Sequence, residues 1–483
     1  MIGMAEFRRW SVCWFVSTSA VFLAPNFFTY AVILVGVFLV ARRHGVNPLG
    51  LYIILIFTAP CLGVGVGIPG IFNRVLDLNV PRLLSMVILA PMAVSLLRKP
   101  ENRKLTPTDL PLALLVGLMS LLALRHADLA SILRSVPGYY LDIALPYFVF
   151  SRQLRSAQDV NHVLLAFVVA IMPLAIIGAF EFLKSWRVYN PAMAQWGLHL
   201  FTPYLFRDGM LRAATTAIEP IAFGVTCMCG AASLATIRHA GIPVLWRWVA
   251  FSILFAGLMA SISRGPWLGF ALFGAILFFA NVRTSIKIAS WMFVPALIVG
   301  SSMFSKLERF VDLLPFVGHA DPGSETYRSE LFKNAIIVID RYPIFGSISF
   351  LSEPEMLQMV QGQGIIDVVN SYLQLTLEFG VIGLLLFVSF FSILCIRLFL
   401  VARCPGESSL NYIGLLGILL ALLFTISTTS SVTFIPYFCW IMAAVCSAAL
   451  KLAENGVHRS SLSAHPFEQA IELPPMRVIG GHR

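Results

Sequence analysis

The chain has 483 residues, of which 58% are hydrophobic and only 12% are charged, and its mean hydropathy is +0.84. Soluble globular proteins carry about 25% charged residues, so this composition excludes an ordinary soluble domain. The formal net charge of +10 is concentrated between apolar runs, where it favours a signal for membrane topology over a nucleic-acid footprint.

Apolar runs that are long enough, or nearly long enough, to cross a bilayer recur along the whole chain. They fall near residues 10–24, 26–41, 47–65, 80–97, 108–124, 139–151, 160–183, 214–236, 246–262, 266–281, 288–303, 371–396, 409–429 and 432–450. The first two could form one broken element, so we predict about 12 to 14 transmembrane helices. The expected fold class is an all-α polytopic membrane protein, with one integral domain over residues 1–453.

Basic residues predict which side of the membrane each end faces. When Arg8 and Arg9 are placed in the cytoplasm, most other clusters of Arg and Lys fall on the same side, as the positive-inside rule requires. Both termini are then cytoplasmic, and the Pro- and Ser-rich residues 454–483 are expected to form a disordered tail there. The first apolar run has no following cleavage site and is expected to stay in the membrane.

A long polar loop over residues 304–370 interrupts the apolar pattern on the outward side. Long loops in compact proteins are usually functional, so chemistry or binding is expected here. The apolar spacing over residues 325–340 predicts a helix that lies on the membrane surface or over a cavity. Pro343 and Gly346 predict its end, because proline disfavours helix at the preceding residue and glycine permits a turn.

Two arginines and one acid lie at the ends of apolar runs. Arg264 stands between two runs with almost no polar spacer, so it either snorkels to the interface or faces a partner in a cavity. Its planar guanidinium group, next to Gly265 in the sequence, is suited to binding a phosphate or a carboxylate. Arg212 begins the next outward element, and Glu219 is expected about two helical turns deeper, either paired with an arginine or functional.

Other signals in the sequence are weaker. Asp142 and Glu181 are acids near or within apolar runs, and nothing nearby in the sequence completes a site around them. The repeated glycines of residues 63–67 are expected to pack closely or to bend the chain. Histidines and cysteines lack metal-ligand spacing, and no nucleotide-binding loop is present, so we expect no metal and no other cofactor. Outward arginines without a nucleotide site favour a substrate that is already activated through a phosphate on a lipid.

Three stretches, in chain order, resemble the O-antigen ligase/O-antigen polymerase (Wzy-type) superfamily of bacterial envelope glycosyltransferases. They are the Arg212-Ala entry to a span, the Ser263-Arg264-Gly265 turn, and the long loop with its exit helix. The loop carries Tyr327-Arg328 … Pro343-Ile-Phe-Gly346, similar to the family's Arg … Pro-x-x-Gly. The exit helix carries Asn370-Ser-Tyr372-Leu-Gln … Glu378-Phe-Gly380-Val-Ile-Gly383, similar to its His-Asn-x-Tyr-Leu-Gln … Glu-x-Gly-x-x-Gly. The resemblance covers roughly residues 160–400.

The resemblance implies a multi-pass protein of the bacterial inner membrane whose long loop is periplasmic. Its substrate would be an undecaprenyl-diphosphate-linked oligosaccharide, and its partners would be the lipid bilayer and other polysaccharide assembly proteins such as a flippase and a chain-length regulator. No nucleic acid is expected. Arg212 and Arg264 would hold the diphosphate and offset charge on the leaving group. Further substrate contacts would come from Arg328, Arg341, Asn370 and Tyr372.

The chain departs from the ligase pattern at the residue before Asn370. Val369 stands where ligases carry a histidine, and Glu219 and Ile221 replace the family's common Asp and Asn around Pro220. A general base would then come from elsewhere, or the step proceeds without strong base catalysis. The candidates for this base are Asp367, Glu219, Glu325 and His319.

The departure favours polymerisation of repeat units of an O-antigen or exopolysaccharide over transfer of a glycan to lipid A-core or protein. A transporter of lipid-linked glycans is a second class, but it would need charged residues through the full depth of the bilayer. A non-catalytic membrane scaffold is a third class, and it would leave a buried Arg264 unexplained.

Overall fold

The computed structural model describes residues 4–68, 70, 72–198, 205–207, 209–237, 242–280, 322–361, 364–403 and 410–463. The predicted run at residues 288–303, the start of the predicted loop at residues 304–321 and most of the predicted tail lie outside the described residues.

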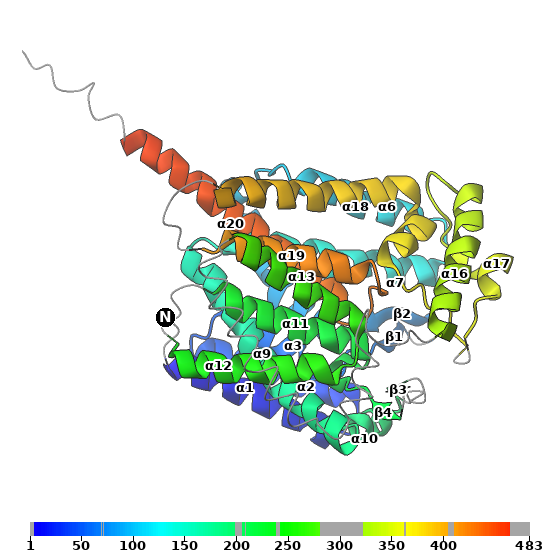
Figure 1. Ribbon diagram of the computed structural model, residues 1–483, viewed down its shortest axis with the longest axis horizontal. Helices are drawn as coiled ribbons and strands as arrows, with labels where there is room; N and C mark the ends of the chain where they lie inside the picture. Colours follow the sequence, from blue (N-terminus) through cyan, green and yellow to red (C-terminus); the bar gives the residue numbers. More distant parts are fainter. Residues whose placement is uncertain are drawn as a thin grey trace, which may run out of the picture.

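The described chain is a bundle of helices that run roughly along one common direction (Figure 1). In chain order the bundle helices are α1 (Met4–Leu23), α2 (Phe27–Arg43), α3 (Pro48–Ile56), α4 (Val80–Leu84), α5 (Ala90–Leu97), α6 (Asp109–Ala123), α7 (Leu129–Tyr139), α8 (Leu145–Gln153), α9 (Ala157–Lys184), α11 (Pro220–Thr236), α12 (Val244–Ala260), α13 (Arg264–Ala280), α18 (Ser371–Arg403), α19 (Tyr412–Ile426) and α20 (Ile435–Ser463). Two π-helical turns, η1 (Ser85–Leu89) and η3 (Tyr140–Ala144), join α4 to α5 and α7 to α8.

Among the described residues, four helical stretches are long and apolar enough to cross a membrane, namely Val80–Leu97, Ala157–Lys184, Ser371–Arg403 and Ile435–Asn455. Five shorter apolar helices of 10–17 residues accompany them. The predicted fold class is therefore confirmed: this is an all-α polytopic membrane protein. The number of about 12 to 14 transmembrane helices stays a prediction, because fewer of the described helices are long and apolar enough to cross a membrane.

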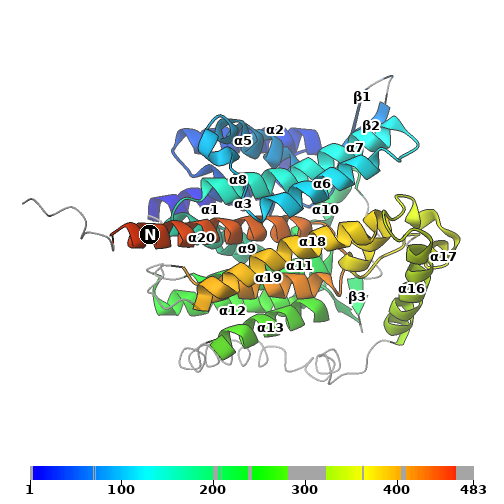
Figure 2. The same ribbon diagram turned by 90° about the horizontal axis from the view of Figure 1, so that it is seen from above.

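The two ends of the bundle differ. The start of α1 and the end of α20 lie at one end, which we call the terminal end (Figure 1). At the opposite end, the loop end, lie α16 (Pro322–Arg341), α17 (Pro354–Leu357) and two small hairpins. The short α10 (Asn190–Gln195) also lies toward this end. Figure 2 shows α16 running across the direction of the bundle helices, as expected for a helix laid over their ends.

The hairpin at the loop end corrects one expectation. The run at 47–65 was expected to be one span, but α3 ends at Ile56 and the glycine-rich stretch forms β1 (Val64–Ile68). This strand pairs antiparallel with β2 (Phe72–Leu78), with Val64 opposite Leu78. The alternation of valine and glycine has the two-residue period of a strand, which the apolar composition concealed.

The start of α11 corrects a second expectation. Residues 210–219 form the short strand β4 (Met210–Leu211), paired with β3 (Phe206–Arg207), and a 3-10 turn, instead of the first turns of a helix. Thr215 and Ile218 have positive φ angles of 47° and 70°, which stop helix here. Pro220 then opens α11, because its fixed φ suits the first helical position. Glu219 consequently lies before the helix and is partly buried, not two turns inside it.

A second, smaller apolar core lies beneath α16, separate from the core of the bundle. Leu331, Ala335 and Val338 from one face of α16 are buried against residues of α17 and of the segment that enters α18. The helix predicted at residues 325–340 is thus confirmed, and its apolar face binds it to the loop end.

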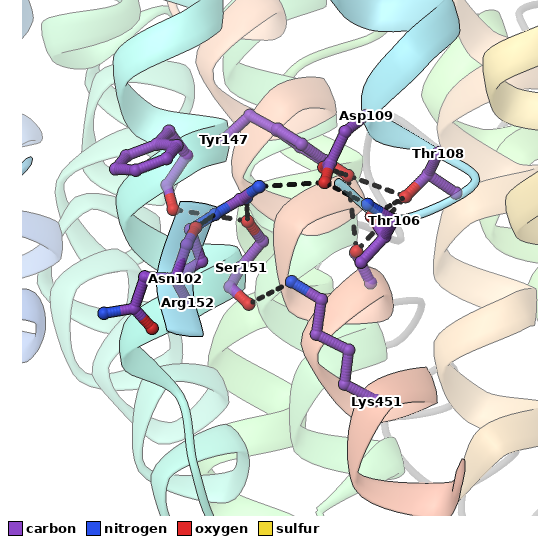
Figure 3. Close-up of polar contacts among 10 residues, drawn as sticks. Asn102, Thr106, Thr108, Asp109, Tyr147, Ser151, Arg152 and Lys451 are labelled. Carbon is purple, nitrogen blue, oxygen red and sulfur yellow. Dashed lines mark hydrogen bonds and ion pairs between the residues drawn. The ribbon is translucent and has the colours of Figure 1, made fainter. Parts of the chain in front are cut away.

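At the terminal end, a buried ion pair joins three helices (Figure 3). Arg152 of α8 contacts Asp109 of α6 with an N–O distance of 2.8 Å, and both side chains are 6% exposed. The Tyr147 hydroxyl donates a hydrogen bond to the same carboxylate at 3.1 Å. From α20, the Lys451 ammonium donates to the carbonyl of Ser151 at 3.2 Å. The network fixes the ends of α6, α8 and α20 relative to one another.

We predict that Asp109→Ala destabilises the protein by about 3–5 kcal/mol, because removing one partner leaves the Arg152 charge buried without compensation. Glu101→Ala is the matched control, since Glu101 pairs with Arg155 at 3.4 Å on an exposed surface and should cost about 1 kcal/mol or less. Thermal unfolding of both variants in the same detergent gives the measurement. Equal shifts in the two variants would contradict a structural role for the buried pair.

Candidate functional site

The exit helix α18 is kinked at Gly380, beside α16 (Figure 1). Gly380 has φ 70° and ψ −174°, a conformation open to glycine and strained for other residues. A Cβ at Gly380 would lie 2.1 Å from the carbonyl oxygen of Ile344. Gly346 also has a positive φ, 62°, and a Cβ there would lie 2.6 Å from the backbone of Glu378. Two backbones therefore touch where both residues lack a side chain.

Hydrogen bonds close this contact on both sides of the kink. The Ser347 N–H donates to the carbonyl of Leu377 at 2.8 Å, and the Val381 N–H donates to the carbonyl of Pro343 at 2.9 Å. The break in α18 thus exposes backbone groups that the Pro343–Gly346 turn satisfies. The predicted end of the loop helix near Pro343 is confirmed, and the two glycine-containing motifs of the resemblance interlock.

The connection between α19 and α20, residues 427–434, lies against the loop. The Arg328 guanidinium donates to the carbonyl of Thr428 at 3.4 Å, and the Ser371 hydroxyl donates to the carbonyl of Thr429 at 2.8 Å. Backbone carbonyls of this connection therefore hold both α16 and the first residue of α18.

Asp367 is held by the same connection. Its carboxylate accepts a hydrogen bond from the Ser430 hydroxyl, which also lies 2.7 Å from the carbonyl of Val368. The Tyr327 hydroxyl donates to the backbone carbonyl of Asp367 at 3.0 Å, and burial raises the pKa of this tyrosine above its usual value. Asp367 is thus fixed between α16 and the connection.

Arg212 and Arg264 are brought to one turn, although 51 residues separate Arg212 from Ser263. Arg212 is 8% exposed, and its Nη2 donates to the Ser263 hydroxyl at 3.0 Å. Arg264 is the next residue and opens α13. The turn before it is strained, since Ile262 has φ 44°. Both predicted diphosphate ligands therefore stand at the N-terminus of α13, which adds positive backbone dipoles.

This turn also touches the α19–α20 connection. A Cβ at Gly265 would lie 2.7 Å from the Thr428 hydroxyl oxygen, so the Thr428 side chain packs closely against the backbone of this turn. Arg328 contacts the carbonyl of the same Thr428. The turn that carries Arg264 and the helix that carries Arg328 thus contact the same residue of the connection.

Glu181 supports the segment that carries Arg212. It is fully buried, and one carboxylate oxygen accepts from the N–H groups of Ala214 and Thr215 at 3.1 and 3.0 Å. The other oxygen accepts from the Val188 N–H at 3.0 Å. The expectation that nothing completes a site around Glu181 was wrong, because its partners are backbone groups that no side-chain pattern reveals.

Arg341 faces carboxylates within the loop. Its two Nη atoms pair with Glu353 at 2.5 Å and with Glu355 at 2.6 Å. The hydrogen bond from Arg341 holds the pKa of the Glu355 carboxyl below its usual range. These contacts of Arg341 therefore join the end of α16 to Glu353 and α17.

Asn370 and Tyr372 hold the start of α18. The Asn370 side-chain oxygen accepts from the N–H groups of Tyr372 and Leu373 at 2.9 and 3.2 Å, the arrangement of a helix N-cap. The Tyr372 hydroxyl donates to the carbonyl of Leu423 at 3.0 Å. Val369, in place of the histidine, packs against the apolar core beneath α16. His319 and the side chain of Glu325 lie outside the described residues.

A cavity of ≈ 430 Å³ opens at the loop end between α7, η3, α18 and α20, and sequence reasoning did not find it. Its lining includes Arg82, Arg134, Asp142 and Glu378. Asp142 therefore lines a cavity, although nothing near it in the sequence completed a site around it. The sequence feature that could have indicated this cavity is the presence of charged residues inside apolar runs, such as Arg82 in the run at residues 80–97. None of the eight predicted site residues lines this cavity.

The fold and these contacts define a polytopic helical membrane protein whose helical loop is docked at the end that also carries the buried Arg212 and the partly buried Arg264. Residues 249–388 match the family model Wzy_C, described as O-Antigen ligase, and this match supports a similarity of that segment to the O-antigen ligase/polymerase superfamily. No curated protein matches the chain. The matched segment includes Arg264, Arg328 and the contact between Gly346 and Gly380, whereas Arg212 lies outside it.

We predict that Gly380→Ala loosens the loop, because a side chain there combines positive-φ strain of about 1–3 kcal/mol with a backbone clash. Hydrogen exchange at the Ser347 and Val381 amides should accelerate markedly. Gly117→Ala in α6 is the matched control: its Cβ meets nothing within 4 Å, and alanine favours helix by about 1 kcal/mol. Unchanged exchange in Gly380→Ala would show that the interlocked glycines do not hold the loop.

Proposed function

We propose that this protein polymerises undecaprenyl-diphosphate-linked oligosaccharide repeat units into an O-antigen or exopolysaccharide at the periplasmic face of the bacterial inner membrane. The observation that carries the proposal is the meeting of Arg212 and Arg264 at one turn beneath the loop. It is supported by the Wzy_C match over residues 249–388, which makes a glycosyltransferase-like ligase or polymerase the class to consider.

In this proposal the diphosphate of the donor lies against Arg212, Arg264 and the N-terminus of α13. A hydroxyl of the acceptor sugar attacks the anomeric carbon of the donor, and the bond from that carbon to the phosphate oxygen breaks. Undecaprenyl diphosphate leaves with the bonding electrons, and the arginines stabilise the charge that develops on it. The hydroxyl proton passes to a base or to water, and Glu219 and Asp367 are the proposed general bases for this transfer.

Further substrate contacts are proposed for Arg328, Arg341, Asn370 and Tyr372. Arg328 is exposed at the edge of the α19–α20 connection, where it could reach the glycan beside the diphosphate. Asn370 uses its carbonyl oxygen as a cap, so its NH₂ group is the part that would donate to a sugar. Arg341 would contact substrate while it holds α17.

The proposed orientation places residues 1–453 in the membrane domain, the termini and tail 454–483 in the cytoplasm, and the loop 304–370 in the periplasm. It is supported by the start of α1 and the end of α20, which lie at one end of the bundle (Figure 1), and by the basic residues there. Arg42 and Arg43 end α2, and Arg9 of α1 donates to the carbonyl of His44 at 2.7 Å. Clustered arginines at one end are the positive-inside pattern.

The alternative is ligase-type transfer of the glycan to lipid A-core or protein, which the description of the family model favours. Val369 favours polymerisation, because it packs in the apolar core where the ligase pattern has a histidine. A transporter is the least supported class. The flippase and chain-length regulator remain proposed partners in either case.

We predict that Arg212→Ala and Arg264→Ala each abolish high-molecular-weight polymer while the protein still inserts in the membrane. Gel analysis of surface glycans, with an immunoblot of the membrane fraction, gives the measurement. Lys333→Ala is the control, since Lys333 is exposed on α16 and its loss removes a cation away from the turn. Polymer of normal length in both arginine variants would overturn the mechanism.

Deletion of the gene separates polymerase from ligase. Because a polymerase acts before transfer, its loss should leave single repeat units that still reach their destination. Loss of a ligase should instead strand full-length chains on the carrier lipid. Analysis of lipid-linked and surface glycans from the same deletion strain decides between the two.

A further inference from the structure

We propose that the loop-end cavity is a saccharide-binding subsite, which holds sugar residues of the acceptor glycan through Glu378, Arg134 and Gln374. This inference rests on the proposed function and deepens it, since it assigns the acceptor to a place apart from the diphosphate ligands. The cavity volume of ≈ 430 Å³ lies within the range of about 300–1,000 Å³ that is typical of small-molecule sites.

One wall of the cavity is a fixed ion pair. The Arg82 guanidinium of α4 donates to both carboxylate oxygens of Asp142 in η3, with contacts of 2.7 to 3.1 Å. The Tyr437 hydroxyl of α20 donates to the same carboxylate at 2.7 Å. Gly138 leaves room for the guanidinium, because a Cβ there would lie 3.1 Å from Nη2 of Arg82. The charges of this wall are therefore neutralised before any ligand arrives.

The groups left for a ligand come from α7 and α18. Glu378 lines the cavity, and its carboxylate forms no hydrogen bond or ion pair with any other residue in the described part of the chain. One N–H of the Arg134 guanidinium donates to the Ser131 hydroxyl at 3.0 Å, and the guanidinium has further N–H groups that can donate to a ligand. Gln374 lies one turn before Glu378 on α18. A carboxylate, an amide and a guanidinium together match the donors and acceptors of neighbouring sugar hydroxyls.

The balance of charge favours a sugar over a diphosphate or a lipid tail. The lining carries two arginines and three carboxylates, and two of these carboxylates are already paired, Asp142 with Arg82 and Asp77 with Arg74 outside the lining. The cavity is therefore close to neutral, and a diphosphate would be attracted to Arg212 and Arg264 instead. A hydrocarbon chain would bury these polar groups without replacing their hydrogen bonds. Tyr139 and Trp440 add aromatic surface for the apolar faces of a sugar ring.

The α19–α20 connection lies between the two places. Ser371 and Ser431 line the cavity, and Ser371 is bonded to the carbonyl of Thr429. The neighbouring Thr428 touches Gly265, next to Arg264. A glycan in the cavity and a diphosphate at the α13 turn would therefore meet along this connection, as a transfer between them requires.

Binding to the full-length chain in lipid nanodiscs tests the proposal with two probes. The first is the repeat-unit oligosaccharide, released by mild acid from the carrier lipid of the host strain. The second is undecaprenyl diphosphate without sugar. Glu378→Gln and Arg134→Gln should each weaken oligosaccharide binding at least about tenfold, the loss expected for one charge-assisted hydrogen bond. Their affinity for undecaprenyl diphosphate should stay within about twofold of the wild-type value.

Glu330→Gln is the matched control for Glu378→Gln, because Glu330 is an exposed carboxylate on α16 and its loss changes the net charge by the same amount. Wild-type oligosaccharide affinity in Glu378→Gln and Arg134→Gln would overturn the subsite, as would failure of the wild-type chain to bind the oligosaccharide. Should Arg212→Ala and Arg264→Ala keep full affinity for undecaprenyl diphosphate, the diphosphate site of the proposed function fails instead. Failure of the saccharide subsite and failure of the diphosphate site are thus detected with different probes and different variants.

Discussion

The left-handed backbone at Gly380 is the constraint on which the loop end depends. In an apolar surrounding each backbone N–H and C=O needs a partner, and a helix normally supplies it from its own chain. The kink removes the partners within the helix for the Leu377 carbonyl and the Val381 N–H. The Ser347 N–H and the Pro343 carbonyl, from the turn after α16, bind these two groups instead. The loop is therefore attached by main-chain bonds that depend on two glycines, in addition to the apolar face of α16. This attachment holds α16 over the end of the bundle, where Arg328 reaches the α19–α20 connection.

The same connection divides the loop end into two electrostatic environments. On one side, Arg212 and Arg264 gather positive charge at a helix N-terminus. On the other side, the cavity is close to neutral because Arg82 is already paired with Asp142. A polyanion and an uncharged glycan would be sorted by this difference before any specific contact forms. Sorting of this kind suits a reaction that joins two substrates, since each must be held without displacing the other.

The sequence predicted what depends on local pattern and missed what depends on distant contacts. Apolar runs predicted most bundle helices, and the spacing of residues 325–340 predicted α16, because both follow from the period of a helix. The hairpin at Val64–Leu78 was missed because apolar composition hid its two-residue period. The pairing of Arg82 with Asp142 spans 60 residues, and Glu181 binds backbone groups. No residue pattern within one segment reveals such partners.

The replacement of histidine by Val369 takes on a physical meaning in this arrangement. Val369 packs into the apolar core beneath α16, so this position now contributes to docking the loop. Two residues earlier, the Asp367 carboxylate accepts from Ser430 of the connection, on the side that also carries Thr428. This contact holds the Asp367 side chain against the connection, whose Thr428 also touches the turn at Gly265. In the proposed function, any general base of this loop end would therefore act beside the connection and not at the position of the missing histidine.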